Sequence, residues 1–121
     1  MLTLNYRDTR PIYEQIYDGL RRLMLTGAIA PEEKLPSVRE LAADAGVNPN
    51  TVQRALAELE GTGLLHTQRT AGRFVTEDTA VIRSAKEDLA RSRTREYLES
   101  MAQLGYDRQQ VKALLEEWKE E

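Results

Sequence analysis

Residues 37–60 read SVRELAADAGVNPNTVQRALAELE, and this stretch decides the fold. Ser37 and Glu40 form a capping box, in which each side chain bonds the other residue's backbone N–H, so a helix begins at Ser37. Gly46 ends that helix, because glycine adopts the left-handed conformation without steric cost. The Asn-Pro pair at 48–49 then supplies the N-cap and the first residue of a second helix. The stretch therefore predicts two short helices joined by a tight turn.

Apolar spacing in this stretch matches a helix-turn-helix, whose second helix enters the DNA major groove. An ordinary helical hairpin uses similar spacing, so the surface has to decide between the two. The second helix, residues 48–60, presents short hydrogen-bonding side chains, and no Asp or Glu occurs from residue 45 to 57. Such a surface suits base edges and phosphates, which favours DNA binding. The positions expected to pack in the core are Leu41, Ala42, Ala45, Val47, Val52 and Ala55, with Gly46 at the turn.

A β-hairpin is predicted directly after the second helix. Residues 64–76 contain two runs of β-formers around a turn at 70–72, and they include no Asp or Glu. A hairpin in this position is the wing of a winged helix-turn-helix. Arg69 and Arg73 flank its turn and are expected to lie along the minor groove or on the DNA backbone. Either arginine alone could also serve only to keep an edge hairpin soluble.

A further helix and a connector precede this region. Pro11 begins an apolar repeat of helical period that Gly27 ends, and two prolines make residues 28–36 an extended connector. Tyr6 and Arg7, ahead of that helix, are candidates for a contact with the DNA backbone. A packed or disordered N-terminal arm explains them equally well.

The chain changes character after Thr76. Apolar residues recur at helical spacing, but an arginine-rich interruption at 91–95 leaves open whether residues 80–104 form one helix. A capping pattern at 107–110 then begins a final helix. The predicted fold is mainly α with a small β-hairpin wing. A winged helix-turn-helix domain over residues 1–76 is followed by a helical region over 77–121.

Composition excludes several functional classes. The chain has 121 residues, one His and no Cys, which removes disulfides, zinc fingers, iron–sulfur clusters and thiol nucleophiles. It shows no phosphate-binding loop, metal-ligand pair or nucleophile elbow, so we expect no enzyme activity, no cofactor and no metal. His66 falls in a predicted strand and is expected on the hairpin surface. Without a secretory signal or a membrane-spanning segment, the expected location is the cytoplasm.

The linked motifs resemble the GntR family of bacterial transcription regulators, over roughly residues 9 to 76. The resemblance rests on PIYEQI at 11–16, GAIAP at 27–31, LPSVRELA at 35–42, VNPNTV at 47–52, GLL at 63–65 and GRFV at 72–75. The VNPNTV signature and the short tail with LGYD at 104–107 are similar to the YtrA subfamily. That resemblance implies a C-terminal region made of a pair of helices used for dimerisation.

The resemblance also implies a set of DNA contacts at the start of each helix of the helix-turn-helix. These residues are Arg39, Asn48, Asn50, Thr51 and Gln53. Two positions in the wing depart from the family pattern. Thr70 stands where glycine is common and is expected to stiffen the tip, and Arg73 stands where a small polar residue is common and is expected to add a phosphate contact.

Arg39 and Gln53 are the residues expected to read bases. Arginine can bond O6 and N7 of guanine together, and glutamine can bond N6 and N7 of adenine. A surface ion pair with a nearby acid is the alternative for Arg39, although a cation at a helix N-terminus is unfavourable unless an anion lies close. Ser37 and Thr51 more often cap a helix or touch a phosphate, and Arg54 completes the polar surface.

The predicted function is sequence-specific DNA binding by a homodimeric repressor. Residues 78–121 would pair with the same segment of a second chain, so that the dimer reads a palindromic operator. Alternatively, the tail packs onto the first helix of its own chain, or the winged helix is a protein-docking module without specific DNA binding. A small-molecule effector would act by changing the spacing of the two recognition helices, but the sequence indicates no pocket for one.

Charge distribution supports the DNA-binding hypothesis. The formal net charge is -3, which by itself opposes binding to a polyanion. Residues 1–76 hold nine basic and nine acidic residues, whereas residues 77–121 hold eight and eleven. The acidity therefore belongs to the tail, and the predicted reading surface is free of it.

Overall fold

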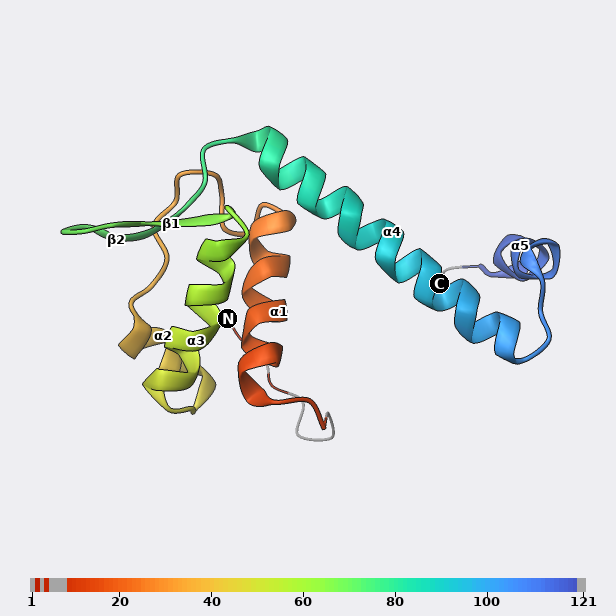
Figure 1. Ribbon diagram of the computed structural model, residues 1–121, viewed down its shortest axis with the longest axis horizontal. Coiled ribbons are helices and arrows are strands. Elements are labelled where there is room, and N and C mark those ends of the chain that lie inside the picture. Colours follow the sequence, from red (N-terminus) through yellow and green to blue (C-terminus); the bar gives the residue numbers. More distant parts are fainter. Residues whose placement is uncertain (1, 3, 5–8, 120–121) are drawn as a thin grey trace. The chain divides into compact units, whose positions relative to one another are not determined.

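The computed structural model describes residue 2, residue 4 and residues 9–119. It confirms a mainly helical winged helix-turn-helix with a two-stranded hairpin, followed by C-terminal helices (Figure 1). The chain forms two compact units, one ending at Ser84 and one beginning at Ala85. The elements are α1 (Ile12–Leu25), α2 (Val38–Ala45), α3 (Pro49–Gly61), β1 (Leu65–Gln68), β2 (Gly72–Val75), α4 (Thr79–Gln103) and α5 (Arg108–Glu117).

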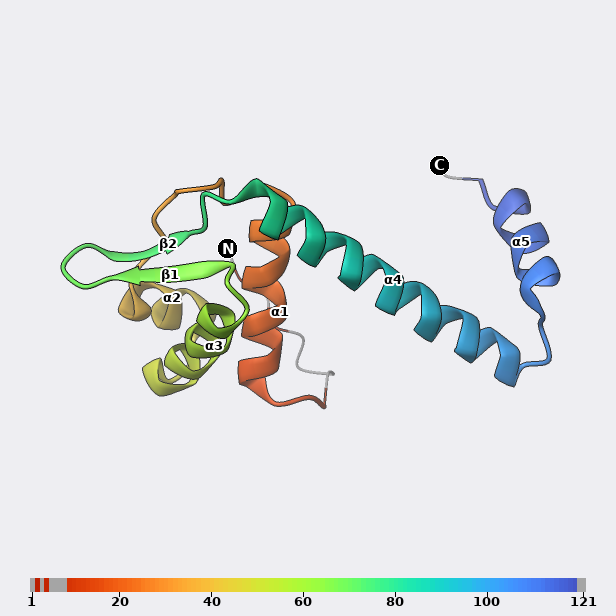
Figure 2. The same ribbon diagram turned by 45° about the horizontal axis from the view of Figure 1, so that its top comes forward.

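The core of the first unit lies where α1 and α2 pack against α3. Figures 1 and 2 show α1 and α3 side by side, with the hairpin projecting beyond them. Each helix contributes apolar residues at helical spacing, which places them on one face. The most buried large side chains are Ile16, Leu20, Met24, Leu41, Val52, Leu56, Leu59, Leu64, Leu65 and Val75.

Both predicted caps of the helix-turn-helix are confirmed. The Glu40 N–H donates to Ser37 Oγ at 3.1 Å, and the Ser37 N–H donates to Glu40 Oε1 at 3.3 Å. Gly46 follows α2 with a φ of 69°, and Asn48 caps α3. Val47 is only half-buried, because it lies in the turn between the helices and packs on one side alone.

The wing has a third stretch of backbone beside it. β1 and β2 pair antiparallel, with His66 opposite Phe74. The connector runs along the outer edge of β2, where the Leu35 N–H donates to the Arg73 carbonyl at 2.9 Å and the Val75 N–H donates to the Glu33 carbonyl at 3.0 Å. The sequence analysis predicted only an extended connector here, because this pairing depends on residues forty positions away. Gly72 belongs to β2 and not to the turn.

The C-terminal helices are regular but leave apolar side chains in solvent. α4 is one continuous helix through the arginine-rich segment, which settles that open question, and α5 begins with a capping box between Asp107 and Gln110. Leu104, Leu115 and Trp118 are 72%, 60% and 78% exposed. Within the residues that the structure describes, no helix combines the length and the apolar character needed to cross a bilayer.

Candidate nucleic-acid interface

The exposed face of α3 carries the polar residues that the sequence singled out. Val52, Ala55, Leu56 and Leu59 are buried, so the remaining positions of α3 point outward. Asn50, Gln53 and Arg54 are exposed, and Thr51 is half-buried. The Asn48 side-chain oxygen accepts the Asn50 N–H at 2.8 Å, so its amide NH₂ is the group left to face outward.

The start of α2 adds an exposed arginine to this face of the domain. In the described part of the chain, Arg39 makes no ion pair and no side-chain hydrogen bond, so the predicted alternative, a pair with Glu40 or Asp44, is absent. The Glu40 carboxylate is occupied by the Ser37 N–H. Asp44 accepts the Leu2 N–H at 3.1 Å, and this bond is the main reason why the pKa of Asp44 lies below its ordinary value.

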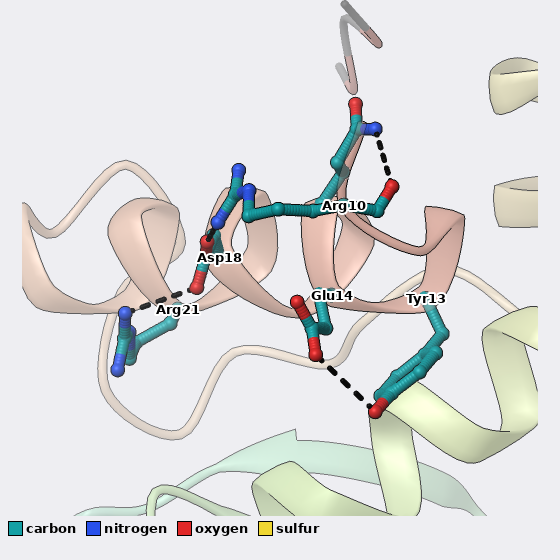
Figure 3. Close-up of polar contacts among 6 residues, drawn as sticks. Arg10, Tyr13, Glu14, Asp18 and Arg21 are labelled. Atoms are coloured by element: carbon teal, nitrogen blue, oxygen red, sulfur yellow. Dashed lines mark hydrogen bonds and ion pairs between the residues drawn. The ribbon is translucent and has the colours of Figure 1, made fainter. Parts of the chain in front are cut away.

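Arg54 lies flat against an aromatic ring of α1. Its guanidinium carbon is 3.6 Å from the centre of the Tyr13 ring. The Tyr13 hydroxyl contacts Glu14 Oε1 at 3.4 Å, and Figure 3 shows the Tyr13 side chain reaching from α1 toward α3. Arg54 was predicted to contact DNA, but its aromatic partner was not predicted, because the two residues are 41 positions apart.

Two further arginines of the first unit are bound to one acid. Asp18 lies between Arg10 and Arg21 on α1 (Figure 3). Its contact with the Arg21 guanidinium is 3.0 Å, and that guanidinium also lies 5.0 Å from the centre of the Tyr17 ring. These two arginines therefore share one carboxylate on α1, in contrast to Arg39 and Arg54.

The two predicted wing arginines have different surroundings. Arg69 is exposed at the hairpin tip and has no partner among the described residues. Arg73 is half-buried, and its Nε donates to Glu60 Oε1 at 3.0 Å. Glu60 also accepts a hydrogen bond from the Thr67 hydroxyl, and this bond first, then Arg73, holds the pKa of Glu60 below its ordinary value. The wing is thus bonded to the end of α3.

Lys34 is a basic residue beside the wing that the sequence analysis missed. Its Cε lies 2.9 Å from the point where a Cβ on Gly72 would stand. A hollow of about 530 Å³ between the start of α2 and the wing turn is lined by Lys34, Ser37 and Thr70 among others. Lys34 follows two glutamates in the sequence, so no local pattern marks it as a basic residue of the wing. Only its backbone bridge to Phe74 brings it to the wing.

Three further expectations from the sequence concern His66, metal binding and the pair Tyr6 and Arg7. His66 is exposed and stacks on Phe74, with ring centres 5.9 Å apart, so it lies on the hairpin surface as expected. No group of His, Cys, Asp and Glu in the described ranges could hold a metal ion. Tyr6 and Arg7 lie outside the described residues.

Comparison with known proteins identifies the family. Residues 12–75 match "Bacterial regulatory proteins, gntR family". The chain belongs to this family. It is therefore a DNA-binding transcriptional regulator, as predicted from the resemblance, and this family is one of regulators and not of enzymes.

Two curated gntR relatives come from Bacillus subtilis strain 168. The uncharacterized HTH-type transcriptional regulator YhcF is 34% identical over 106 residues, which cover 88% of each chain. The HTH-type transcriptional repressor YtrA is 45% identical over 78 residues, covering 64% of this chain and 60% of the relative. The predicted likeness to the YtrA subfamily is confirmed.

A solved structure supports the same assignment over nearly the whole chain. A GntR family transcriptional regulator from Listeria monocytogenes superposes with a TM-score of 0.87 at 38% identity. The match covers 93% of this chain and 98% of that one. The winged helix-turn-helix and the helices after it therefore occur together in this gntR relative.

Proposed function

We propose that this gntR regulator is a homodimeric repressor that binds a palindromic operator. In each half-site α3 lies in the major groove, and the wing, residues 64–76, lies on the minor groove or the backbone. One observation carries the proposal. The exposed positions of α3 before Glu58 carry no acid, and α2, which packs against α3, presents an arginine that has no acidic partner in the described part of the chain.

The residues divide into readers of bases and binders of backbone. Arg39 and Gln53 read guanine and adenine, because their forked or amide ends bond two base atoms at once. The others fix the position of the protein on the duplex through phosphates. This second group contains Ser37, Asn48, Asn50, Thr51, Arg54, Arg69 and Arg73, the last through the terminal nitrogens that Glu60 does not occupy.

Residues 78–121 form the dimer contact in this proposal, as part of a region that begins at residue 77. Leu115 and Trp118 are exposed in the single chain, and burying such side chains against a second copy is favourable. A two-fold dimer presents two copies of α3, so the half-sites lie about one helical turn apart. The relative YtrA is described as a repressor, which supports repression through occlusion of a promoter.

Footprinting on DNA from upstream of the protein's own gene tests the assignment. Arg39→Ala and Gln53→Ala should each lower affinity for the protected site by about 5- to 150-fold, the range for one bidentate base contact. Arg22→Ala is the matched control, since Arg22 is exposed at the other end of α1 from Tyr13. Equal protection by both reader variants would contradict the base-reading roles. Absence of binding to any fragment at low salt would favour a docking module.

A further inference from the structure

Arg54 and Tyr13 form a contact between the second turn of α3 and the first turn of α1. The guanidinium carbon stands 3.6 Å from the ring centre, which is stacking distance and well inside the range of about 6 Å for a cation–π contact. Arg54 is exposed, whereas Tyr13 is half-buried. The ring therefore supports the guanidinium from the protein side and leaves its other side to solvent.

Stacking leaves the hydrogen-bonding edge of an arginine free. The guanidinium is planar and its N–H donors lie in that plane, so a ring on one face does not compete with a phosphate at the edge. No carboxylate bonds Arg54 among the residues that the structure describes, in contrast to Arg21 and Arg73. Arg54 is thus held in place without being neutralised.

The direction of Arg54 follows from helix geometry. Successive residues of an α-helix are rotated by about 100°, because one turn takes 3.6 residues. If Gln53 faces the base edges in the groove, Arg54 points sideways toward α1. The walls of the major groove are formed by the phosphate backbones. Arg54 therefore points at a backbone and not at a base.

The position of the ring is itself well determined. Tyr13 precedes by one turn of α1 the fully buried Ile16, and α1 packs against α3 through this face. Its hydroxyl contacts the Glu14 carboxylate at 3.4 Å. The packing of α1 and this contact both restrict the position of the ring.

We propose that Tyr13 is a positioning residue that holds Arg54 ready to bind a phosphate beside the recognition helix. The inference rests on the proposed DNA-binding function and adds a residue of α1 to it. By restricting the guanidinium before DNA arrives, the ring reduces the side-chain entropy lost on binding. Tyr13 itself contacts no DNA in this proposal.

A double-mutant cycle in DNA affinity tests the proposal. Binding is measured for the wild type, Tyr13→Leu, Arg54→Gln and the double variant, on the footprinted operator and on a duplex of arbitrary sequence, over a range of salt. Arg54→Gln should weaken binding about tenfold on both duplexes and reduce the salt slope by about 1 per half-site. Tyr13→Leu alone should weaken DNA binding about threefold. The same change made in Arg54→Gln should have no further effect on binding.

Matched controls separate positioning from folding. Tyr13→Phe keeps the ring and should bind as the wild type does. Tyr17→Leu removes a second tyrosine of α1 that also lies under an arginine, but that arginine is paired with Asp18, so DNA affinity should not change. Thermal melts of every variant show whether the domain is intact.

The outcomes are distinct. If Tyr13→Leu lowers DNA affinity by the same factor in the wild-type and in the Arg54→Gln background, Tyr13 acts through the fold. That result would overturn the inference. An unchanged salt slope in Arg54→Gln would overturn the phosphate contact. A folded wild-type protein that binds neither duplex at low salt would instead overturn the proposed function, and the inference with it.

Discussion

The DNA-binding unit buries most of its large apolar residues, whereas the C-terminal helices leave several of theirs exposed. Of the 17 buried apolar residues in the described chain, 16 lie between Ile16 and Val75, and Val111 is the one in the tail. The tail exposes Leu104, Leu115 and Trp118 instead. The first unit completes its own core, whereas the second leaves apolar side chains in solvent.

The difference has a geometric cause. In the first unit α1, α2, α3 and the base of the wing meet around one centre, so each covers the apolar face of another. The tail has α5 and most of α4 with which to cover its apolar residues. A helix pair buries at most the faces turned toward each other, and the outer faces remain in water. Stability of the first unit should therefore be intrinsic, whereas that of the tail should depend on a partner.

The largest expected effect comes from removing a core side chain of the first unit. Leu56 is 1% exposed, and Leu56→Ala should lower the free energy of unfolding by about 2–5 kcal/mol, because a cavity remains where the side chain stood. Urea or thermal unfolding of the full chain measures this. Leu115→Ala is the matched control and should not change the unfolding of the first unit. A similar loss in both variants would contradict the contrast between the two regions.

Charging the apolar surface of the tail should break the dimer and spare the first unit. Leu115→Asp would place an unpaired charge in the interface, and the Kd for dimerisation should rise at least about a hundredfold. Sedimentation at micromolar concentration measures the dimer, and melting of the first unit should be unchanged. Glu116→Gln, a change at the next position, is the control. A monomeric wild type under these conditions would show that the dimer proposal is wrong.

Replacing a glycine of the wing should lower the free energy of unfolding more than replacing a glycine of α3. Gly72 has a φ of 106°, which side chains rarely adopt, so Gly72→Ala should cost about 1–3 kcal/mol. The close Lys34 side chain is flexible and can move aside. Gly61→Ala is the control, because Gly61 has an ordinary helical conformation with open space around it, and it should be neutral or slightly stabilising. Equal melting temperatures for the two variants would contradict this strain.

The smallest effect is expected from the bond between α3 and the wing. The pKa of Glu60 is lowered, so its contribution to stability is present above the unfolded-state value of about 4.3 and is lost as the pH falls through the lower folded-state value. Glu60→Gln should cost less than about 1 kcal/mol at pH 7, because the pair is partly exposed. The difference from the wild type should shrink as the pH falls through the folded-state value. Glu58→Gln, also exposed on α3, should show no such pH dependence.

Local signals in the sequence accounted for most of the fold. The capping boxes at Ser37 and Asp107, the left-handed Gly46 and the Asn48 cap are all where the sequence predicts them. Each of these caps and turns depends on residues within a few positions of one another, so the local sequence is enough to predict it. Val47 was predicted to be buried and is only half-buried, because the turn exposes one side of it.

The candidate site was predictable in its residue types but not in its contacts. The polar residues of α3 and the arginine of α2 stood out because acids are absent around them or because they begin a helix. The stacking of Arg54 on Tyr13 and the bond from Arg73 to Glu60 join residues that are distant in the chain. Lys34 reaches the wing only because the connector forms a backbone bridge to β2. No local pattern marks such pairs.

By itself, the sequence determined the helix-turn-helix, its caps, the wing and the family, since these follow from short-range periodicity, turn chemistry and linked motifs. Only the tertiary structure decided which cations are free and which are neutralised. The state of a charge depends on what lies within a few ångströms of it, and in this protein those neighbours come from other elements. Arg73, bound to an acid, and Arg54, supported by a ring, carry the same charge and have different groups left unbonded within the protein.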